Sequence, residues 1–218
     1  MIELTHSYSA IKMYENCPKR YHHQRVLKEV TDKGNEITQW GERVHKMLED
    51  RLAENTELPQ EVVRYEPLYK SMIRMAEGGE LLPEEEMTLN ASLKPTGWWD
   101  ADAWLRSKID VLIIKDGVGA MFDWKTGKRR PDPSQLELFA LQVFTHRQDV
   151  KKINTSFVWL KDLTMDSKSY TRADIPELWE KLLGKIARIE QSAKTDNWPA
   201  RPSGLCNFCP CKSFCEYV

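Results

Sequence analysis

The segment KIDVLIIKDGVGAMFDWKTGKRR, residues 108–130, constrains the fold of this chain more than any other. Its apolar run over residues 109–114 is rich in β-branched side chains, which is typical of a buried strand. Asp116 and Gly117 form a turn signal, and a second apolar run covers residues 118–124. The two runs therefore predict a hairpin of two antiparallel strands at the centre of a sheet.

Two acidic residues and one lysine lie on this hairpin. Asp110 stands near the start of the first strand, and Asp123 and Lys125, two residues apart on the second, point to the same face. Carboxylates bind hard divalent cations such as Mg²⁺, which take phosphate oxygens as further ligands. A lysine beside such a metal can position a water and offset charge that develops on a phosphate. An Asp-x-Lys sequence alone more often marks a solvated ion pair, so the hypothesis of metal-assisted phosphodiester hydrolysis needs support from the flanking elements.

Length and composition indicate one globular domain, residues 1–218, because 41% hydrophobic and 30% charged residues are typical of such proteins. No apolar run approaches a membrane span, and the N-terminus lacks a signal pattern. We therefore expect no membrane contact and a cytoplasmic protein, with a phage-encoded origin as one alternative. A net charge of −1 does not by itself predict nucleic-acid binding, which would have to use the basic runs at residues 19–25 and 125–130.

The remaining periodicity predicts helices and strands that alternate around one sheet, an α/β fold. Gln135 is expected in the first turn of the helix after the hairpin, near the end of the strand that carries Asp123. The helices are expected from Ser7 or Ser9 to Cys17, over 19–27, 38–53, 59–76, 135–147 and 176–193, and the further strands over 87–91, 98–105, 153–160 and 169–172.

Four of the five cysteines lie in the last thirteen residues, which in a reducing compartment favours metal ligation over disulfides. Cys206, Cys209 and Cys215 supply three thiolates, and Cys17 is a candidate for the fourth. The local set of Cys206, Cys209, Cys211 and Cys215 is the competing choice. The spacing leaves an iron–sulfur cluster and zinc nearly even. If Cys17 takes part, residues 1–30 and 198–218 form one subregion around the metal.

Four short motifs follow one another along the chain: Gly41-x3-His45, Ile109-Asp110, Asp123-Trp124-Lys125 and Gln135-x3-Phe139. Together with one early and three late cysteines, they resemble the RecB-type branch of the PD-(D/E)XK nuclease superfamily. The resemblance covers most of the chain. It is closest to the iron–sulfur members of that branch: the CRISPR-associated adaptation nucleases, the nuclease domains of AddAB-type helicase–nucleases, and related phage exonucleases.

The resemblance implies a restriction-endonuclease-like fold, in which helices flank a mixed central sheet and a metal cluster joins the N- and C-terminal segments. It implies His45, Asp110, Asp123 and the backbone carbonyl of Trp124 as ligands of Mg²⁺ or Mn²⁺, and Lys125 as the catalytic lysine beside the two aspartates. The family's Gln-x3-Tyr motif keeps Gln135 but has Phe139 in place of the tyrosine, so that hydroxyl is missing. The cysteine pattern moves the preference to a [4Fe–4S] cluster on Cys17, Cys206, Cys209 and Cys215, with Cys211 as an extra thiol and zinc as the less favoured metal.

A protein of this kind is expected to be a divalent-metal-dependent deoxyribonuclease, an exonuclease on single-stranded or end-containing DNA. The sequence has no P-loop, so unwinding would need a helicase or a recombination or CRISPR partner protein. The alternative is a catalytically dispensable iron–sulfur subunit that binds DNA ends in a larger complex. We expect an aromatic stacking surface and phosphate contacts along a groove, supplied by Tyr21, Arg25, Lys128, Arg129, Arg130 and Gln135.

Overall fold

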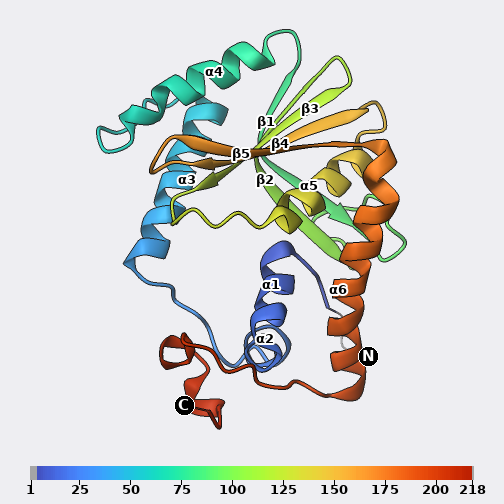
Figure 1. Ribbon diagram of the computed structural model, residues 1–218. Helices are drawn as coiled ribbons and strands as arrows, with labels where there is room; N and C mark the ends of the chain where they lie inside the picture. Colours follow the sequence, from blue (N-terminus) through green and yellow to red (C-terminus); the bar gives the residue numbers. More distant parts are fainter. Residues whose placement is uncertain (1–3, 218) are drawn as a thin grey trace.

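A five-stranded sheet lies at the centre of the computed structural model, which describes residues 4–217 (Figure 1). The strands follow chain order: β1 (Glu80–Leu89), β2 (Leu105–Lys115), β3 (Val118–Lys125), β4 (Lys152–Trp159) and β5 (Thr164–Thr171). Neighbouring strands are antiparallel except β3 and β4, which are parallel. A parallel pair needs a crossover connection, and α5 (Pro133–His146) lies within it. The predicted mixed sheet is confirmed.

The predicted central hairpin is confirmed as β2 and β3. Lys115 pairs with Val118 across a two-residue turn, in which Asp116 (φ 50°) and Gly117 (φ 73°) both adopt the left-handed conformation. A turn with two positive φ angles matches the twist of the flanking strands, which explains the Asp-Gly sequence. The turn also sets the register that brings the strand positions of Asp110 and Asp123 to the same end of the hairpin.

Helices cover both faces of this sheet (Figure 1). On one face α5 packs with α1 (Tyr8–Asn16) and α6 (Ile175–Thr195) around a core that includes Leu112 and Phe144. On the other face α3 (Glu36–Glu54) and α4 (Glu66–Ala76) enclose a second core with Val111 and Trp124. The α/β fold with a sheet between two helical layers therefore agrees with the prediction.

The regular pairing of the edge strand β1 with β2 is interrupted at one point, where the side chains of β1 change the face to which they point. Glu84 has a φ of 50°, and the pairing that joins Pro83 to Val111 and Glu85 to Ile109 lapses there. Leu82 and Met87 consequently pack into the same core although strict alternation would separate them. This local twist lies where the acidic residues of the site converge.

Several elements differ from the prediction; β5, for example, begins at Thr164, five residues before the strand expected over 169–172. The expected helix over 59–76 begins only with a 3₁₀ turn, η2 (Val63–Tyr65), before α4. Residues 98–104 form turns where a strand was expected, because Asp100 accepts hydrogen bonds from the backbone of Gly97 and the hydroxyl of Thr96. β1 starts seven residues earlier than expected and contains Pro83, which an edge strand tolerates.

The N-terminal helical region around α2 and the C-terminal segment lie side by side (Figure 1). α2 (Pro18–Tyr21) and a π-helical turn, η1 (His22–Val26), meet the C-terminal segment with its 3₁₀ turns η4 (Cys206–Phe208) and η5 (Lys212–Phe214). Trp198 stacks on Tyr21 and His22 at ring-centroid distances of 5.9 and 4.9 Å. The amide of Lys19 donates to the carbonyl of Pro199 at 3.3 Å.

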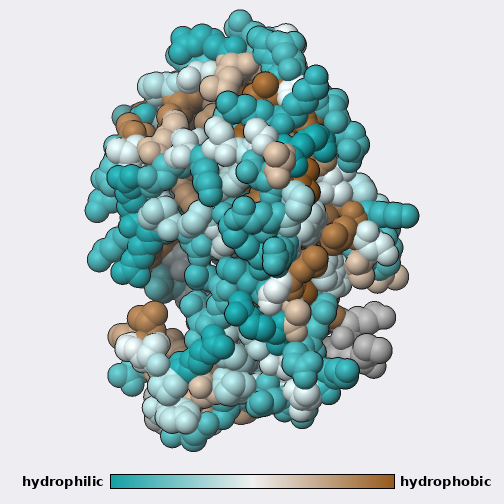
Figure 2. All heavy atoms as spheres, turned by 45° about the vertical axis from the view of Figure 1, so that its right-hand side comes forward, coloured by the Kyte–Doolittle hydropathy of each residue, from teal (hydrophilic) through white to brown (hydrophobic). Residues whose placement is uncertain are grey.

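The molecular surface is mainly hydrophilic on the face shown in Figure 2, where hydrophobic residues form only small patches. Among the helices of residues 4–217, none is both long and apolar enough to cross a membrane.

Candidate active site

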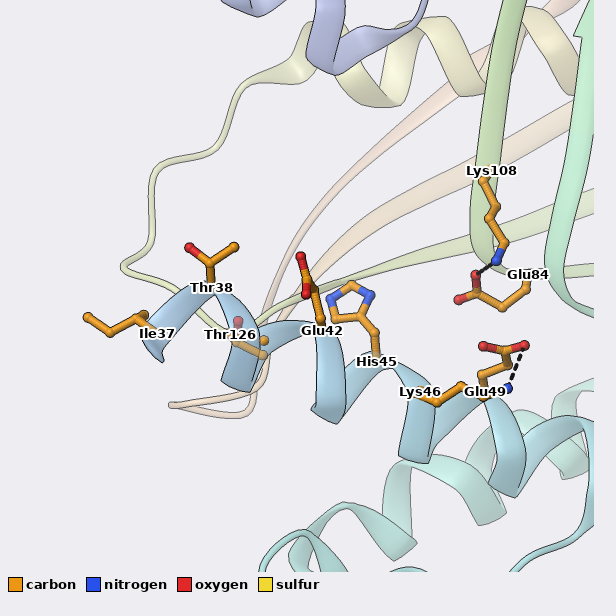
Figure 3. A pocket seen from close by; sticks show the side chains of 10 residues that line it. Ile37, Thr38, Glu42, His45, Lys46, Glu49, Glu84, Lys108 and Thr126 are labelled. Carbon is orange, nitrogen blue, oxygen red and sulfur yellow. Dashed lines mark ion pairs between the residues drawn. The ribbon is translucent and has the colours of Figure 1, made fainter. Parts of the chain in front are cut away.

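Three side chains from three different elements converge on one point. His45 of α3, Glu84 of β1 and Asp110 of β2 each offer a ligand atom, and these atoms lie within 4.8 Å of one another. Figure 3 shows His45 and Glu84 approaching from the helix and the strand. An imidazole with two carboxylates is a donor set suited to a divalent cation such as Mn²⁺ or Mg²⁺.

Asp110 lies where the pairing of β2 and β3 ends, and its carboxylate replaces a backbone hydrogen-bond partner there. Oδ2 accepts a hydrogen bond of 2.7 Å from the backbone amide of Trp124, and Oδ1 lies 3.5 Å from Nδ1 of His45. Burial alone would lower the pKa of His45, but the hydrogen bond and charge of Asp110 outweigh it, so this pKa lies above its ordinary value. Asp110 thus links the hairpin to α3.

Asp123, Lys125 and Gln135 form a second group beside the first. The amide nitrogen of Gln135 donates to Oδ1 of Asp123 at 2.7 Å, and its oxygen accepts from the ammonium of Lys125 at 2.9 Å. The same ammonium lies 2.5 Å from Oδ2 of Asp123. Burial and the charge of Asp110 raise the pKa of Asp123 to about 7, against the opposing effects of Lys125 and His45. A cation at this point would relieve the crowding of carboxylates.

Glu84 was not among the residues predicted for the site. Its left-handed backbone places a non-glycine residue in a conformation that costs about 1 kcal/mol or more, and such residues concentrate at functional sites. Burial raises the pKa of its carboxyl group, while the ion pair with Lys108 at 2.6 Å lowers it. The glutamate run at residues 84–86 was the available signal, and the late expected start of β1 left it outside the sheet.

Gly41 explains the first motif in physical terms. A Cβ at this position would lie 2.8 Å from the hydroxyl oxygen of Thr126, so a larger residue would force the Thr126 side chain to move or α3 to lie further from the end of β3. His45 follows one helical turn later and reaches Asp110 as a result. The spacing of Gly41 and His45 therefore sets the distance between helix and hairpin.

Two cavities flank these groups. The larger, of about 530 Å³, lies along α3 and includes His45, Glu84 and Lys108 in its lining (Figure 3). The smaller, of about 200 Å³, lies on the α5 side and is lined by Tyr8, Lys125, Gly127, Lys128, Arg130, Asp132, Gln135, Phe157 and Trp159.

The residues predicted to contact DNA differ in their exposure and in their contacts. Tyr21 is 1% exposed and stacked on Trp198, so the expectation of an accessible stacking ring is wrong: the apolar ring is used to pack the N-terminal helices. Arg25 is exposed, and burial, together with the charge of Arg25, lowers the pKa of His6, which belongs to neither of the two side-chain groups described above. Arg129 is held by both carboxylate oxygens of Asp166. Lys128 and Arg130 line the smaller cavity, and their contact with DNA stays a prediction.

Phe139, in the position of the family tyrosine, is 4% exposed and belongs to the core under α5. Gln135 is the part of this motif that faces the site, where it orients Asp123 and Lys125.

The cysteines of the two chain ends lie in one region. The sulfur of Cys17 accepts a 3.5 Å hydrogen bond from the amide of Arg201, and burial, with Cys209 and Cys17 close by, raises the pKa of the Cys211 thiol to about 11. Cys211 is 3% exposed, whereas the other four cysteines are partly exposed. Within residues 4–217 no three cysteine sulfurs lie within 4.8 Å of one another.

Carboxylates and a lysine around the splayed end of a hairpin, in a mixed sheet flanked by helices, define a site for divalent-metal chemistry on phosphodiesters. The sequence matches the PD-(D/E)XK nuclease superfamily over residues 5–216, and the chain belongs to this superfamily. Membership agrees with the resemblance drawn from the motifs, while the RecB-type iron–sulfur branch stays a prediction.

Among solved structures, the chain is similar to a protein from Eubacterium rectale described as a "putative exonuclease". The TM-score is 0.54 with 15% identity, over 95% of this chain and 87% of that one, which shows a shared fold. SSO0001 aligns with a TM-score of 0.44 and 14% identity over 98% and 86% of the two chains. The alkaline exonuclease LHK-Exo from Laribacter hongkongensis aligns with a TM-score of 0.37 and 10% identity over 88% and 90%. No protein with a curated description matches the sequence significantly.

Proposed function

We propose that the chain, acting as one domain, is a divalent-metal-dependent deoxyribonuclease, an exonuclease on single-stranded or end-containing DNA. The observation that carries the proposal is the convergence of His45, Glu84 and Asp110 within 4.8 Å, beside the ion pair of Asp123 and Lys125. Superfamily membership and the similarity to a protein described as a "putative exonuclease" support the same activity.

The residues of the site fit a hard divalent cation. His45, Glu84, Asp110 and Asp123, with the backbone carbonyl of Trp124, would hold Mg²⁺ or Mn²⁺. When bound, such a metal activates a water and polarises a phosphate. The raised pKa of Asp123 indicates that its buried carboxylate lacks sufficient positive charge around it, although Lys125 lies 2.5 Å away. Glu84 extends the predicted ligand set by one carboxylate.

Lys125 is the candidate for the proton-handling and charge-offsetting role. Its ammonium is fixed between Asp123 and Gln135 and faces the smaller cavity, so it can orient a water or stabilise an oxygen that becomes negative. Gln135 acts on it by position, because one amide group holds both the acid and the ammonium.

Incubation with end-labelled single- and double-stranded DNA tests the proposal. We expect cleavage from ends with Mg²⁺ or Mn²⁺ and none with EDTA. Glu84→Gln keeps the size of the side chain and removes its charge, so we expect weaker metal binding and slower cleavage. Lys46→Gln is a matched control from the rim of the larger cavity, since Lys46 pairs with Asp50 on its own helix. Cleavage that persists in EDTA would exclude the metal-dependent reaction.

We further propose that Cys17, Cys206, Cys209 and Cys215 hold a [4Fe–4S] cluster. A supporting observation is that Cys17 and the C-terminal segment lie in one region, where the sulfur of Cys17 meets the amide of Arg201. Such a cluster would tie the chain ends together. Cys211 is 3% exposed, whereas the four proposed ligands are partly exposed, which suits the role of a bystander.

Anaerobic purification tests the cluster. We expect brown protein with about four iron atoms per chain. Cys17→Ser should lose the iron, whereas Cys211→Ala should retain it. Colourless, active protein with one zinc would identify the wrong metal, and iron loss in Cys211→Ala alone would establish the local ligand set.

A further inference from the structure

The smaller cavity has the chemistry of an anion site. Lys125, Lys128 and Arg130 contribute positive charge to its lining, against the carboxylate of Asp132. Its volume of about 200 Å³ is sufficient for a phosphate group and part of its sugar, and it opens directly beside Lys125. Since the lysine is placed to act at the reacting phosphate, a neighbouring phosphate of the same strand is the group that would reach this cavity.

Tyr8 contributes the aromatic hydroxyl of this cavity. It is the first residue of α1, whose start is fixed by Ser7, where the side-chain oxygen accepts from the amide of Ala10 at 3.3 Å. One turn later Lys12 forms a 2.7 Å ion pair with Asp132, which holds α1 against the start of α5. The half-buried ring of Tyr8 is therefore held in place from both sides.

The hydroxyl of Tyr8 lies beside Asp132, a carboxylate that also accepts from three other donors. Asp132 accepts from the amide of Ser134 at 3.1 Å, from its hydroxyl at 2.6 Å, and from Lys12 at 2.7 Å. A carboxylate has about four acceptor positions, so Asp132 keeps three donors when the hydroxyl of Tyr8 turns to a ligand. Burial, then Asp132 and Asp123, raise the pKa of Tyr8 well above its ordinary value. The group thus remains a proton donor at any working pH.

We propose that this cavity binds a backbone phosphate of the substrate strand adjacent to the scissile one, and that Tyr8 donates a hydrogen bond to its non-bridging oxygen. The proposal rests on the proposed nuclease function and assigns a residue from α1 to substrate binding. Phe139 has no hydroxyl and is buried, so it makes no such contact. Lys128 and Arg130 supply the charge, and Tyr8 supplies the directed donor.

The first test compares Tyr8→Phe with wild type, using end-labelled single-stranded DNA. Binding is measured in Ca²⁺ and single-turnover cleavage in Mn²⁺. Loss of a hydrogen bond to a charged phosphate predicts about 10-fold to 100-fold weaker binding or lower kcat/KM. Tyr14→Phe is the matched control on the same helix, because its hydroxyl bonds to the carbonyl of Arg188 and to Ser192 instead. It should lose stability without a comparable loss of DNA affinity.

The second test replaces the substrate phosphates, one at a time, by neutral methylphosphonates. Wild type should lose affinity strongly at one position next to the cleaved bond, and Tyr8→Phe should lose much less at that position and equally elsewhere. Wild-type affinity in Tyr8→Phe, or equal losses of both proteins at every position, would overturn the proposal. A wild type that neither binds nor cleaves DNA would instead overturn the proposed function. The wild-type scan also keeps the test informative if the variant fails to fold.

Discussion

At the scale of single residues, the buried carboxylate of Asp123 is destabilised by burial and by repulsion from Asp110, and a bound cation would reduce both effects. Asp123 is buried, close to Asp110, and held by Lys125 and Gln135. Its pKa of about 7 in the folded chain stands well above the ordinary value of 3.8. The folded state therefore binds this proton more tightly than the unfolded state, and the group makes the metal-free protein less stable as pH rises.

Asp123→Asn should consequently stabilise the metal-free protein while it abolishes cleavage. The stability difference from wild type should be near zero at about pH 4, grow through the interval up to pH 7, and stay constant above it. At pH 8 we expect the Tm to rise by about 2–8 °C. Thermal melts in EDTA across this pH range check the expectation. A variant less stable than wild type at pH 8 would contradict the assigned burial of charge.

Lys125→Ala tests the second role at this scale. Removing a positioned proton-transfer group lowers rates by about 10²–10⁴-fold, and we expect that loss in kcat with DNA affinity largely retained. Lys115→Ala on the adjacent strand is the control, because its ammonium donates to the carbonyl of Glu77 and not to the site. Equal rates for Lys125→Ala and the control would show that the lysine has no catalytic role.

At the scale of elements, α1 and α5 form a unit that positions Gln135. Asp132 is the N-cap of α5 and also the partner of Lys12 on α1, so a single carboxylate both starts one helix and holds the other. Gln135 lies in the first turn that this cap stabilises. Fraying of that turn would release Lys125 and Asp123 together.

Asp132→Ala should therefore lower both stability and activity. Loss of the cap costs about 1–2 kcal/mol, whereas Asp132→Asn keeps a capping oxygen and should cost well under half as much. Lys12→Ala removes only the partly exposed ion pair, for about 0.5–1 kcal/mol. Urea denaturation and single-turnover cleavage check this order. If Lys12→Ala proves as damaging as Asp132→Ala, the ion pair and not the cap would be the main constraint.

Local sequence patterns predict some elements and site residues of this fold, whereas others depend on contacts between distant parts of the chain. The central hairpin, α5 and α6 could be predicted because period and turn chemistry agree there, as the Asp116–Gly117 turn shows. The place of Glu84 in the site could not be predicted from the sequence. It depends on a left-handed backbone conformation and on pairing between β1 and β2, and neither follows from the secondary-structure preferences of the local residues. Tyr21 was assigned to the surface because a basic run surrounds it, whereas packing against Trp198 buries its ring.

At the scale of the whole molecule, the region around α2 packs against the C-terminal segment, and both carry cysteines. Besides the stacking on Trp198, Lys19 pairs with Glu216 and the guanidinium of Arg201 donates to the carbonyl of Glu15. Cys17 ends α1, the same helix that carries Tyr8 and Lys12 to the catalytic side. The proposed cluster and the active site are thus connected by one helix.

Loss of the cluster should therefore destabilise the molecule and slow cleavage in parallel. By analogy with a cross-link that closes nearly the whole chain, Cys17→Ser should lower the free energy of unfolding by about 5 kcal/mol. Cys211→Ala, which leaves the proposed ligands intact, should show a smaller loss from packing alone. Iron content, melting temperature and cleavage rate are compared for the two variants. Full stability of Cys17→Ser would contradict the closure of the chain ends by a metal.

The most direct test of the account as a whole is the single-turnover cleavage rate of Asp110→Asn relative to wild type, with end-labelled DNA in Mn²⁺. Asp110 contacts His45, accepts from the amide of Trp124 and lies with Glu84, so every part of the proposed metal centre depends on its charge. We predict that the variant retains DNA binding in Ca²⁺ but cleaves at least about 10³-fold more slowly. Cleavage at the wild-type rate by Asp110→Asn would contradict the account.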